Sequence, residues 1–218
     1  MNRTKLTTRE RILDASEVAF AVHGFNGVSL RDIVKRAGVN LAAVNYHFGD
    51  LESLYLEVIR RRIRPLNEAR IARLDRAVQE AGDGPPALTE IVEILVRPVF
   101  ELHGDATRGG PHFVRLLARS LWEPLPFVKG LLAEDFHPTL MRFSQVLRRQ
   151  VPHLAPEDFM WRMSFIVGAM QHTLGTMHQM HALTRGICPD NDHHGALARF
   201  VESAVAVLKS PARPNPRE

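Results

Sequence analysis

The sequence contains a single cysteine, Cys188, so the chain cannot carry an internal disulfide framework. No stretch approaches the roughly 18 uncharged apolar residues that cross a membrane. Residues 1–10 lack the apolar segment of a secretory signal, so we expect a cytoplasmic protein with no membrane partner. Phosphate-binding loops, GxSxG nucleophile motifs, HExxH zinc motifs and Rossmann glycine patterns are also missing, which argues against an enzyme.

Histidine is more plentiful, with eleven residues, and raises the question of a metal site. His178 and His181 are three residues apart on one expected helix and can face a single ion. No pattern of cysteines or carboxylates completes a recognisable site around them. Cys188 has only Arg185 as a cation close to it in the sequence, so a redox role has little to support it. We therefore expect no metal and no other cofactor.

Positive charge gathers near the N-terminus. Residues 1–36 contain seven lysines and arginines against four aspartates and glutamates, a net +3, while the whole chain carries +4 at pH 7. Attraction to DNA phosphates needs such an excess. Arg3 and Lys5, in a flexible arm, can reach phosphates or a minor groove, although a frayed and solvated tail explains them equally well.

Two short helices around a tight turn are predicted between Ser29 and Phe48. Ser29 suits an N-cap, and Asp32 three residues later completes an approximate capping box. Gly38 ends the first helix, because a residue without Cβ can adopt the left-handed conformation of a sharp turn. Asn40 suits the N-cap of the second helix. A helix, a short turn with glycine and a second helix form the outline of a helix-turn-helix DNA reader.

A longer helix is predicted before this pair. Thr7 and Glu10 form a capping box, and an apolar stripe at helical spacing runs from there to Gly24. In the second short helix, Val44 and Phe48 are four residues apart and should face inward, onto the first helix. The three helices together would form a small N-terminal domain.

This region closely resembles the DNA-binding domain of TetR-type transcriptional regulators. The resemblance begins at RILDASEVAFAVHGFNGVSLRDIVKRAGVN, continues through LAAVNYHFGDLESLY, and is most specific at Tyr46-His47-Phe48. It implies a double-stranded DNA operator, a homodimer and a helical C-terminal domain that binds a small-molecule effector. One departure is Gly49-Asp50-Leu51, where family members often have a small polar residue and a phosphate-contacting lysine. Backbone N–H groups at that helix start would take over the phosphate contact.

The second short helix supplies most of the expected DNA contacts. Ala42 and Ala43 let the helix approach base edges and can touch a thymine methyl, and Asn45 can pair with adenine. Leu41 stays open, because helical spacing places it near the core while the family pattern places it at the DNA edge. The predicted DNA-binding residues are Ser29, Arg31, Asn40, Leu41, Ala42, Ala43, Asn45, Tyr46 and His47.

The expected fold is all-α, with a helix-turn-helix domain at residues 1–55, a larger helical ligand-binding and dimerisation domain at 56–209, and a disordered tail at 210–218. The helix that begins at Leu51 carries RRRIR at 60–64, for which we favour a solvated face over a nucleic-acid contact. Pro65 should kink or interrupt this helix. Further helices are expected at 88–102, 112–122, 127–150 with a break near Pro138, 157–181 and 197–208.

Two of the later helices are strongly apolar and suit a four-helix interface between subunits. The alternative is that the same residues form the core of a single chain. The interface prediction names Met163, Gly168, Leu174, Leu197, Val201 and Val205.

A ligand pocket is implied by the family resemblance, although aromatic residues at helical spacing are also typical of an ordinary core. The segments FVRLLARSLWEP and PHLAPEDFMWRMSFIVGAM are similar to the PsrA subgroup of fatty-acid-responsive repressors, which implies an acyl or other amphipathic ligand. Arg115 and Arg119 can hold an acidic headgroup or form surface salt bridges. The predicted pocket residues are Phe100, Phe113, Arg115, Leu117, Arg119, Trp122, Phe136, Phe143, Trp161 and Phe165.

Three functions follow from these observations. The leading hypothesis is a ligand-responsive DNA-binding dimer that represses transcription until its ligand releases it. The second is a constitutive DNA-binding dimer without a ligand, which a filled core would favour. A small-molecule enzyme is the remote third.

Overall fold

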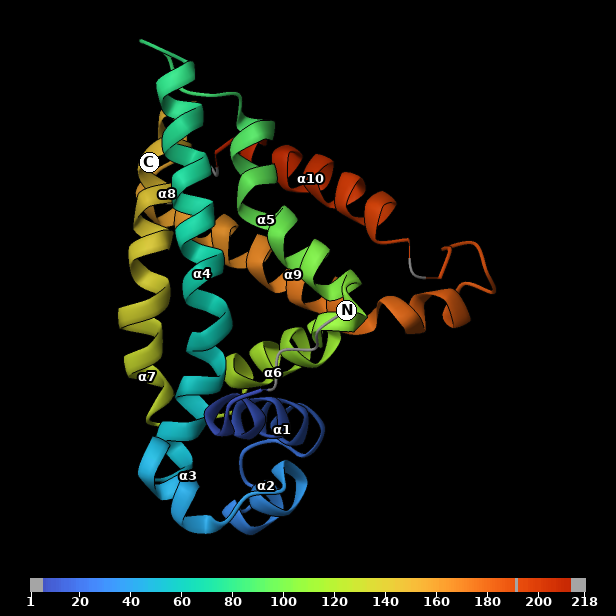
Figure 1. Ribbon diagram of the computed structural model, residues 1–218. Helices are drawn as coiled ribbons and strands as arrows, with labels where there is room; N and C mark the ends of the chain where they lie inside the picture. The colour runs from blue at the N-terminus through green and yellow to red at the C-terminus, as the bar shows by residue number, and fades with distance from the viewer. Residues whose placement is uncertain (1–5, 191, 213–218) are drawn as a thin grey trace. The chain divides into compact units, whose positions relative to one another are not determined.

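A computed structural model describes residues 6–190 and 192–212, and within them every regular element is helical (Figure 1), which confirms the expected all-α class. Arg3, Lys5 and residues 213–218 of the predicted tail lie outside the described residues, as does the side chain of His178. The helices are α1 (Thr8–His23), α2 (Leu30–Ala37), α3 (Leu41–Phe48), α4 (Leu51–Glu80), α5 (Leu88–Gly104), α6 (Gly110–Trp122), α7 (Val128–Leu131), α8 (His137–Gln150), α9 (Pro156–Leu183) and α10 (His193–Lys209), with a 3₁₀ turn at Ala106–Arg108 and a π-helical segment at Leu132–Phe136.

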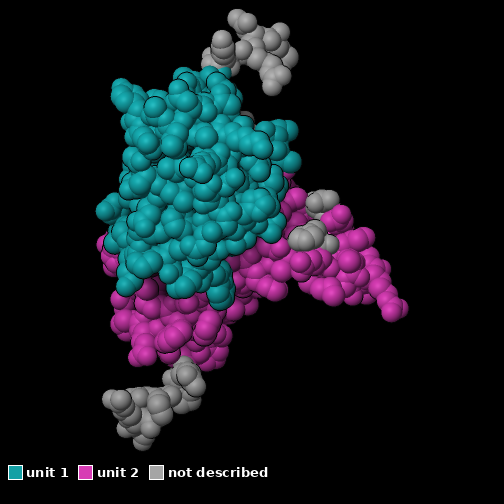
Figure 2. Space-filling view, turned by 90° about the horizontal axis from the view of Figure 1, so that it is seen from below, with its two compact units in different colours: residues 1–65, 105–136 teal, residues 66–104, 137–218 magenta. Residues whose placement is uncertain are grey.

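Contacts divide the chain into two compact units, which Figure 2 colours separately. The first unit contains residues 1–65 and 105–136, and the second contains 66–104 and 137–218. The division falls within α4, directly after Pro65. Residues 105–136 thus pack with the N-terminal helices. The predicted boundary between residues 55 and 56 instead divides the chain by function, into a DNA-binding domain and a ligand-binding domain. That functional boundary stays a prediction.

The two expected proline breaks fall differently in the structure. α4 runs through Pro65 without interruption, because a proline removes one N–H donor and the flanking turns of this 30-residue helix remain bonded. Near Pro138, where a broken or bent helix is expected, the helix is continuous but changes to a π-helical segment at 132–136, between α7 and α8. Pro138 is the second residue of α8 and follows this segment directly, in a helical stretch that continues from residue 128 to residue 150.

The solvated face predicted for residues 60–64 is wrong, because all four arginines form ion pairs inside the first unit. Arg61 and Arg62 bind Glu17 of α1, which is 3% exposed. Arg60 and Arg64 bind Asp135 of the π-helical segment, at 2.9 and 2.6 Å. Burial by itself would raise the pKa of Asp135, but hydrogen bonds from Arg64 and Arg60 lower that pKa overall. Carboxylates distant in the sequence thus neutralise this basic run.

Aromatic side chains fill the core of the first unit. The rings of Phe20 and Tyr55 lie 4.9 Å apart, and those of Phe25 and Phe127 lie 4.8 Å apart. Tyr55 also contacts Phe25 and Phe127, so α1, the following turn, α4 and the segment before α7 share one cluster. This cluster packs α1 against α4 and the segment before α7.

The second unit is built around α10, which packs on α5 and α9. Phe100 and Phe200 meet with ring centres 5.6 Å apart, and His103 of α5 lies 2.9 Å from His193 of α10. Arg162 of α9 donates to carbonyl oxygens at the C-terminal end of α10, where unpaired acceptors attract a cation. None of the helices within the described residues is long and apolar enough to cross a membrane.

Candidate nucleic-acid interface

The start of α2 is secured by a reciprocal capping box. The Asp32 N–H donates to Ser29 Oγ at 3.3 Å, and the Ser29 N–H donates to Asp32 Oδ2 at 3.0 Å. The Ser29 hydroxyl also donates to Asp32 Oδ2 at 2.5 Å. Hydrogen bonds from the Ser29 hydroxyl and N–H lower the pKa of Asp32. The approximate capping box of the sequence is therefore a complete one.

The turn between α2 and α3 depends on Gly38, whose φ of 63° and ψ of 41° are left-handed, as predicted. Arg11 of α1 reaches this turn. Its Nη2 atom donates to the carbonyl oxygens of Ala37 and Gly38 at 2.6 and 2.8 Å. A Cβ at position 38 would lie only 2.9 Å from that Nη2 atom. The guanidinium satisfies acceptors at the negative end of α2 and ties the turn to α1, a role that the sequence does not reveal.

The orientation of α3 follows from its two buried residues, as predicted. Val44 is 0% exposed and Phe48 is 8% exposed. Asn40 caps the helix by accepting the Ala43 N–H at 2.8 Å. Arg9, which pairs with Glu57, places its guanidinium 5.4 Å from the centre of the Phe48 ring.

With that face buried, the opposite face of α3 is presented to solvent. Tyr46 is 86% exposed and Leu41 is 43% exposed, so Leu41 lies on the outer side. Ala42, Asn45 and His47 are exposed as well, and Ala43 is half-buried. Two other predicted contact residues, Ser29 and Asn40, already use their side-chain oxygens as helix caps.

Cations flank this face. Arg31, Lys35 and Arg36 of α2 are exposed, and none of them forms an ion pair with the described residues. They are free to meet DNA phosphates. The start of α4 is less available, because Asp50 accepts the Ser53 N–H at 2.7 Å. Hydrogen bonds from Ser53 and Glu52 lower the pKa of Asp50, so a carboxylate of the chain occupies part of the site expected for a phosphate.

The predicted pocket residues are divided between the two units, and their role in ligand binding stays a prediction. Phe113, Arg115, Leu117, Arg119, Trp122 and Phe136 belong to the first unit, and Phe100, Phe143, Trp161 and Phe165 to the second. Phe100, Phe113 and Phe143 are core residues, whereas Trp122, Trp161 and Phe165 are 75%, 57% and 60% exposed. Arg119 binds Glu123, which fits the salt-bridge alternative, and Arg115 is exposed.

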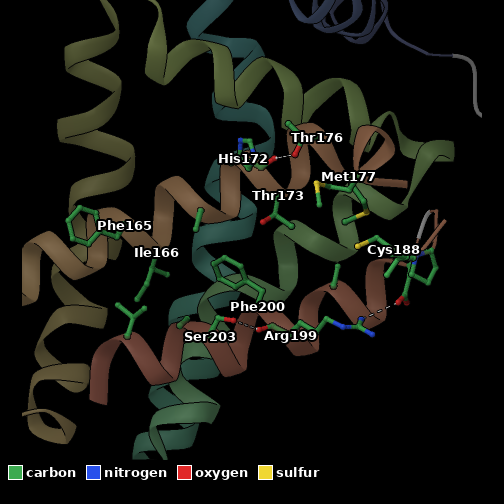
Figure 3. A pocket seen from close by; sticks show the side chains of 18 residues that line it. Phe165, Ile166, His172, Thr173, Thr176, Met177, Cys188, Arg199, Phe200 and Ser203 are labelled. Atoms are coloured by element: carbon green, nitrogen blue, oxygen red, sulfur yellow. Dashed lines mark hydrogen bonds and ion pairs between the residues drawn. The ribbon is translucent and has the colours of Figure 1, made fainter. Parts of the chain in front are cut away.

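The predicted interface residues are mostly internal. Met163, Leu174, Leu197 and Val201 are all less than 7% exposed in the single chain, which fits the alternative of a single-chain core, and their part in a subunit contact stays a prediction. Gly168 and Val205 are half-buried. Alongside them, α9 and α10 enclose a groove of about 810 Å³, into which Ile166 and Phe200 point (Figure 3).

In the part of the chain that the structure describes, no three His, Cys, Asp or Glu side chains lie close enough together to hold a metal ion. The His181 ring lies 3.0 Å from the carbonyl oxygen of Cys188.

Helix α3 is capped and buried on one side and exposed on the other, α1 supports it, and cations of α2 that form no ion pair within the described residues flank it. This arrangement defines a helix-turn-helix DNA-binding protein. Comparison with known proteins identifies the family to which the chain belongs. Residues 12–58 match the family of bacterial regulatory proteins of the tetR type, and residues 93–206 match the tetracyclin repressor-like C-terminal domain. The chain belongs to the TetR family of transcriptional regulators and is a DNA-binding regulator rather than an enzyme.

Individual relatives agree with this assignment. The transcriptional regulator AcrR of Shigella flexneri is 28% identical over 171 residues, which cover 73% of this chain and 72% of AcrR. The transcriptional repressor AcnR of Corynebacterium glutamicum is 36% identical over 53 residues, covering 24% of this chain and 28% of AcnR. A solved SmeT–triclosan complex shares the fold, with a TM-score of 0.59, 18% identity, and coverage of 96% of this chain and 98% of SmeT.

Proposed function

We propose that this protein is a homodimeric transcriptional repressor that inserts α3 into the major groove and leaves its operator when a small molecule binds the second unit. The main support for this proposal is that α3 has one buried and one exposed face. Val44 and Phe48 are buried, while Leu41, Asn45 and Tyr46 are exposed. An eight-residue helix fixed in this way can enter the major groove without rearranging its own packing.

Within the groove, the exposed residues of α3 have different tasks. Asn45 can form two hydrogen bonds with adenine, and Ala42 offers a methyl-sized surface for thymine. The Tyr46 hydroxyl can donate to a phosphate or a base edge, and Lys35 and Arg36 supply sequence-independent attraction. Specificity would therefore rest mainly on Asn45 and Ala42, and affinity mainly on the cations.

Dimerisation is needed because one short helix reads only one half-site, and half-sites on one DNA face lie about 34 Å apart. We propose the outer face of α9 as the contact. Trp161, Phe165, Gly168, His172 and Gly175 follow one another at alternating steps of four and three residues, the spacing of helix–helix seams. All are exposed except Gly168, which is half-buried, and a Cβ at Gly168 or Gly175 would meet nothing within 4 Å in the chain.

The effector is proposed to be an amphipathic or acyl-type small molecule. The SmeT–triclosan complex supports this, because a protein of the same fold has been solved with a small molecule bound. Ligand binding would stabilise a form of the dimer whose α3 helices no longer match consecutive major grooves. A constitutive DNA-binding dimer is the competing function, and it predicts no small molecule that weakens operator binding.

The test begins with selection of an operator from a random duplex library, followed by mobility-shift titrations. The double variant Asn45→Ala/Tyr46→Ala should bind the selected operator at least about 5- to 150-fold more weakly, since the bidentate contact of Asn45 contributes about 1–3 kcal/mol and the loss of the Tyr46 hydrogen bond adds to it. Its melting temperature should stay close to that of the wild type, because both side chains are exposed. Gln145→Ala, an exposed change in α8, serves as the control. Full operator affinity in the double variant would refute the assignment of α3 as the reading helix.

A further inference from the structure

One arginine of the second unit is buried without a carboxylate. Arg70 of α4 is 6% exposed, and its only hydrogen bond within the described residues joins Nη1 to Asn67 Oδ1 at 3.1 Å. No Asp or Glu of these residues lies within ion-pair distance of its guanidinium. This contrasts with the arginines at 60–64 of the same helix, all of which bind carboxylates.

The position of Arg70 explains its burial. Asn67, Arg70, Leu74 and Ala77 recur at steps of three and four residues and are the buried residues of this half of α4. Arg70 therefore lies on the inward stripe, where helices normally carry apolar side chains. The sequence contains this signal, but the surrounding run LNEARIARLDRAVQEA reads as polar throughout.

The geometry of the guanidinium leaves one edge unused. The Nε atom is sealed from solvent and has no acceptor, and Nη2 makes no hydrogen bond to the described residues. Nε and Nη2 form the side of the guanidinium that matches the two oxygens of a carboxylate. Desolvation lowers the pKa of Arg70 to about 9, and at neutral pH the group is still a cation. A buried cation without a counterion is costly, so its retention calls for a partner outside the chain.

We propose that Arg70 is the anchor for the carboxylate of the effector, which would meet the unused Nε and Nη2 edge of the guanidinium. This rests on the proposed function, because it names the ligand class and the recognition group of the regulator. A carboxylate fits better than a phosphate, since a single guanidinium edge offers two parallel donors and no second cation. A neutral ligand would leave the buried charge uncompensated.

A purely structural role for Arg70 makes an opposite prediction. If the guanidinium stabilised the fold through Asn67, its removal would lower the stability of the free protein. If the charge waits for a ligand, Arg70→Met should raise the melting temperature of the ligand-free protein by about 2–8 °C, because an uncompensated buried charge is replaced by an apolar chain of similar length. Arg73→Met, three residues further along α4 and exposed, is the matched control and should change it little.

Binding is measured with a series of probes on the full chain without DNA. Butanoate, decanoate, hexadecanoate and benzoate are compared with the corresponding alcohols by thermal shift and titration calorimetry. We expect at least one carboxylate to stabilise the wild type and the Arg73→Met variant, with its alcohol bound about 10–100-fold more weakly. Arg70→Met should bind that carboxylate no better than the alcohol.

The outcomes separate this proposal from the proposed function. If no carboxylate in the series binds the wild type, or if Arg70→Met binds it as tightly and is less stable, the anchor is refuted while operator binding is unaffected. If the carboxylate binds through Arg70 but no operator can be selected, the anchor stands and the repressor assignment fails. Retained operator binding by Arg70→Met, together with loss of release by the carboxylate, supports both.

Discussion

Replacing Glu17 with glutamine tests whether the ion pairs of α4 stabilise the first unit. Glu17 is 3% exposed and accepts hydrogen bonds from Arg61 Nη2 at 2.8 Å, Arg62 Nε at 3.0 Å and Arg62 Nη2 at 2.9 Å. Glutamine keeps the size of the side chain but removes the charge that both guanidinium groups face. The helix α1 would then lose the buried carboxylate that pairs with both arginines of α4.

The expected cost follows from burial on both sides. Removing one partner of a buried ion pair costs about 3–5 kcal/mol. The two arginine side chains are 22% and 23% exposed, so water screens part of the effect, and Arg61 keeps its contact with Asp14 at 2.6 Å. We therefore expect Glu17→Gln to lower the free energy of unfolding by about 2–4 kcal/mol.

The assay is urea unfolding followed by circular dichroism, with Asp14→Asn as the matched control. Asp14 binds the same arginine but is 51% exposed, so its loss should cost less than about 1 kcal/mol. The midpoint should shift with little change in the denaturant dependence, because the exposed surface area stays the same. Equal costs for the two variants would refute the argument that burial makes the Glu17 pairs important.

Three further predictions concern the interface, the recognition helix and acid stability. Gly168→Trp should convert the dimer to monomer in sedimentation velocity while the chain stays folded, since its Cβ position is open; an intact dimer would remove α9 as the contact. Asn40→Ala should lower stability by about 1 kcal/mol in thermal unfolding and weaken operator binding, and an unchanged stability would show that the cap contributes nothing. Because the folded pKa of Asp32 is lowered, its capping box stabilises above the ordinary carboxyl pKa near about 4 and is lost as pH falls through the folded value. Acid unfolding of Asp32→Asn should lack that component, and identical acid profiles would contradict it.

Short-range features of the N-terminal domain were accessible from the sequence. The Thr7–Glu10 and Ser29–Asp32 boxes, the left-handed Gly38 and the Asn40 cap all occur as predicted. Each depends on residues within four positions of one another, so local chemistry is sufficient to define them. The same holds for the inward placement of Val44 and Phe48, which follows from helical periodicity.

Contacts between segments that are distant in the chain could not be predicted from the sequence. The sequence predicts a solvated face for the basic run at 60–64, because its partners Glu17 and Asp135 are separated from it by tens of residues. The hydrogen bond from Arg11 to Ala37, at the turn after α2, joins residues 26 positions apart, and no periodic pattern in the sequence indicates it.

By itself, the sequence determined the helical class, the helix-turn-helix pair α2 and α3, and the inward face of α3, since these depend on caps, turns and spacing along a few helical turns. Only the tertiary structure decided which apolar residues of α9 are core and which remain outside, and that Arg70 is buried without a carboxylate. The physical reason is that burial and charge compensation depend on what other segments bring to a side chain, and a helix cannot specify its neighbours through its own periodicity.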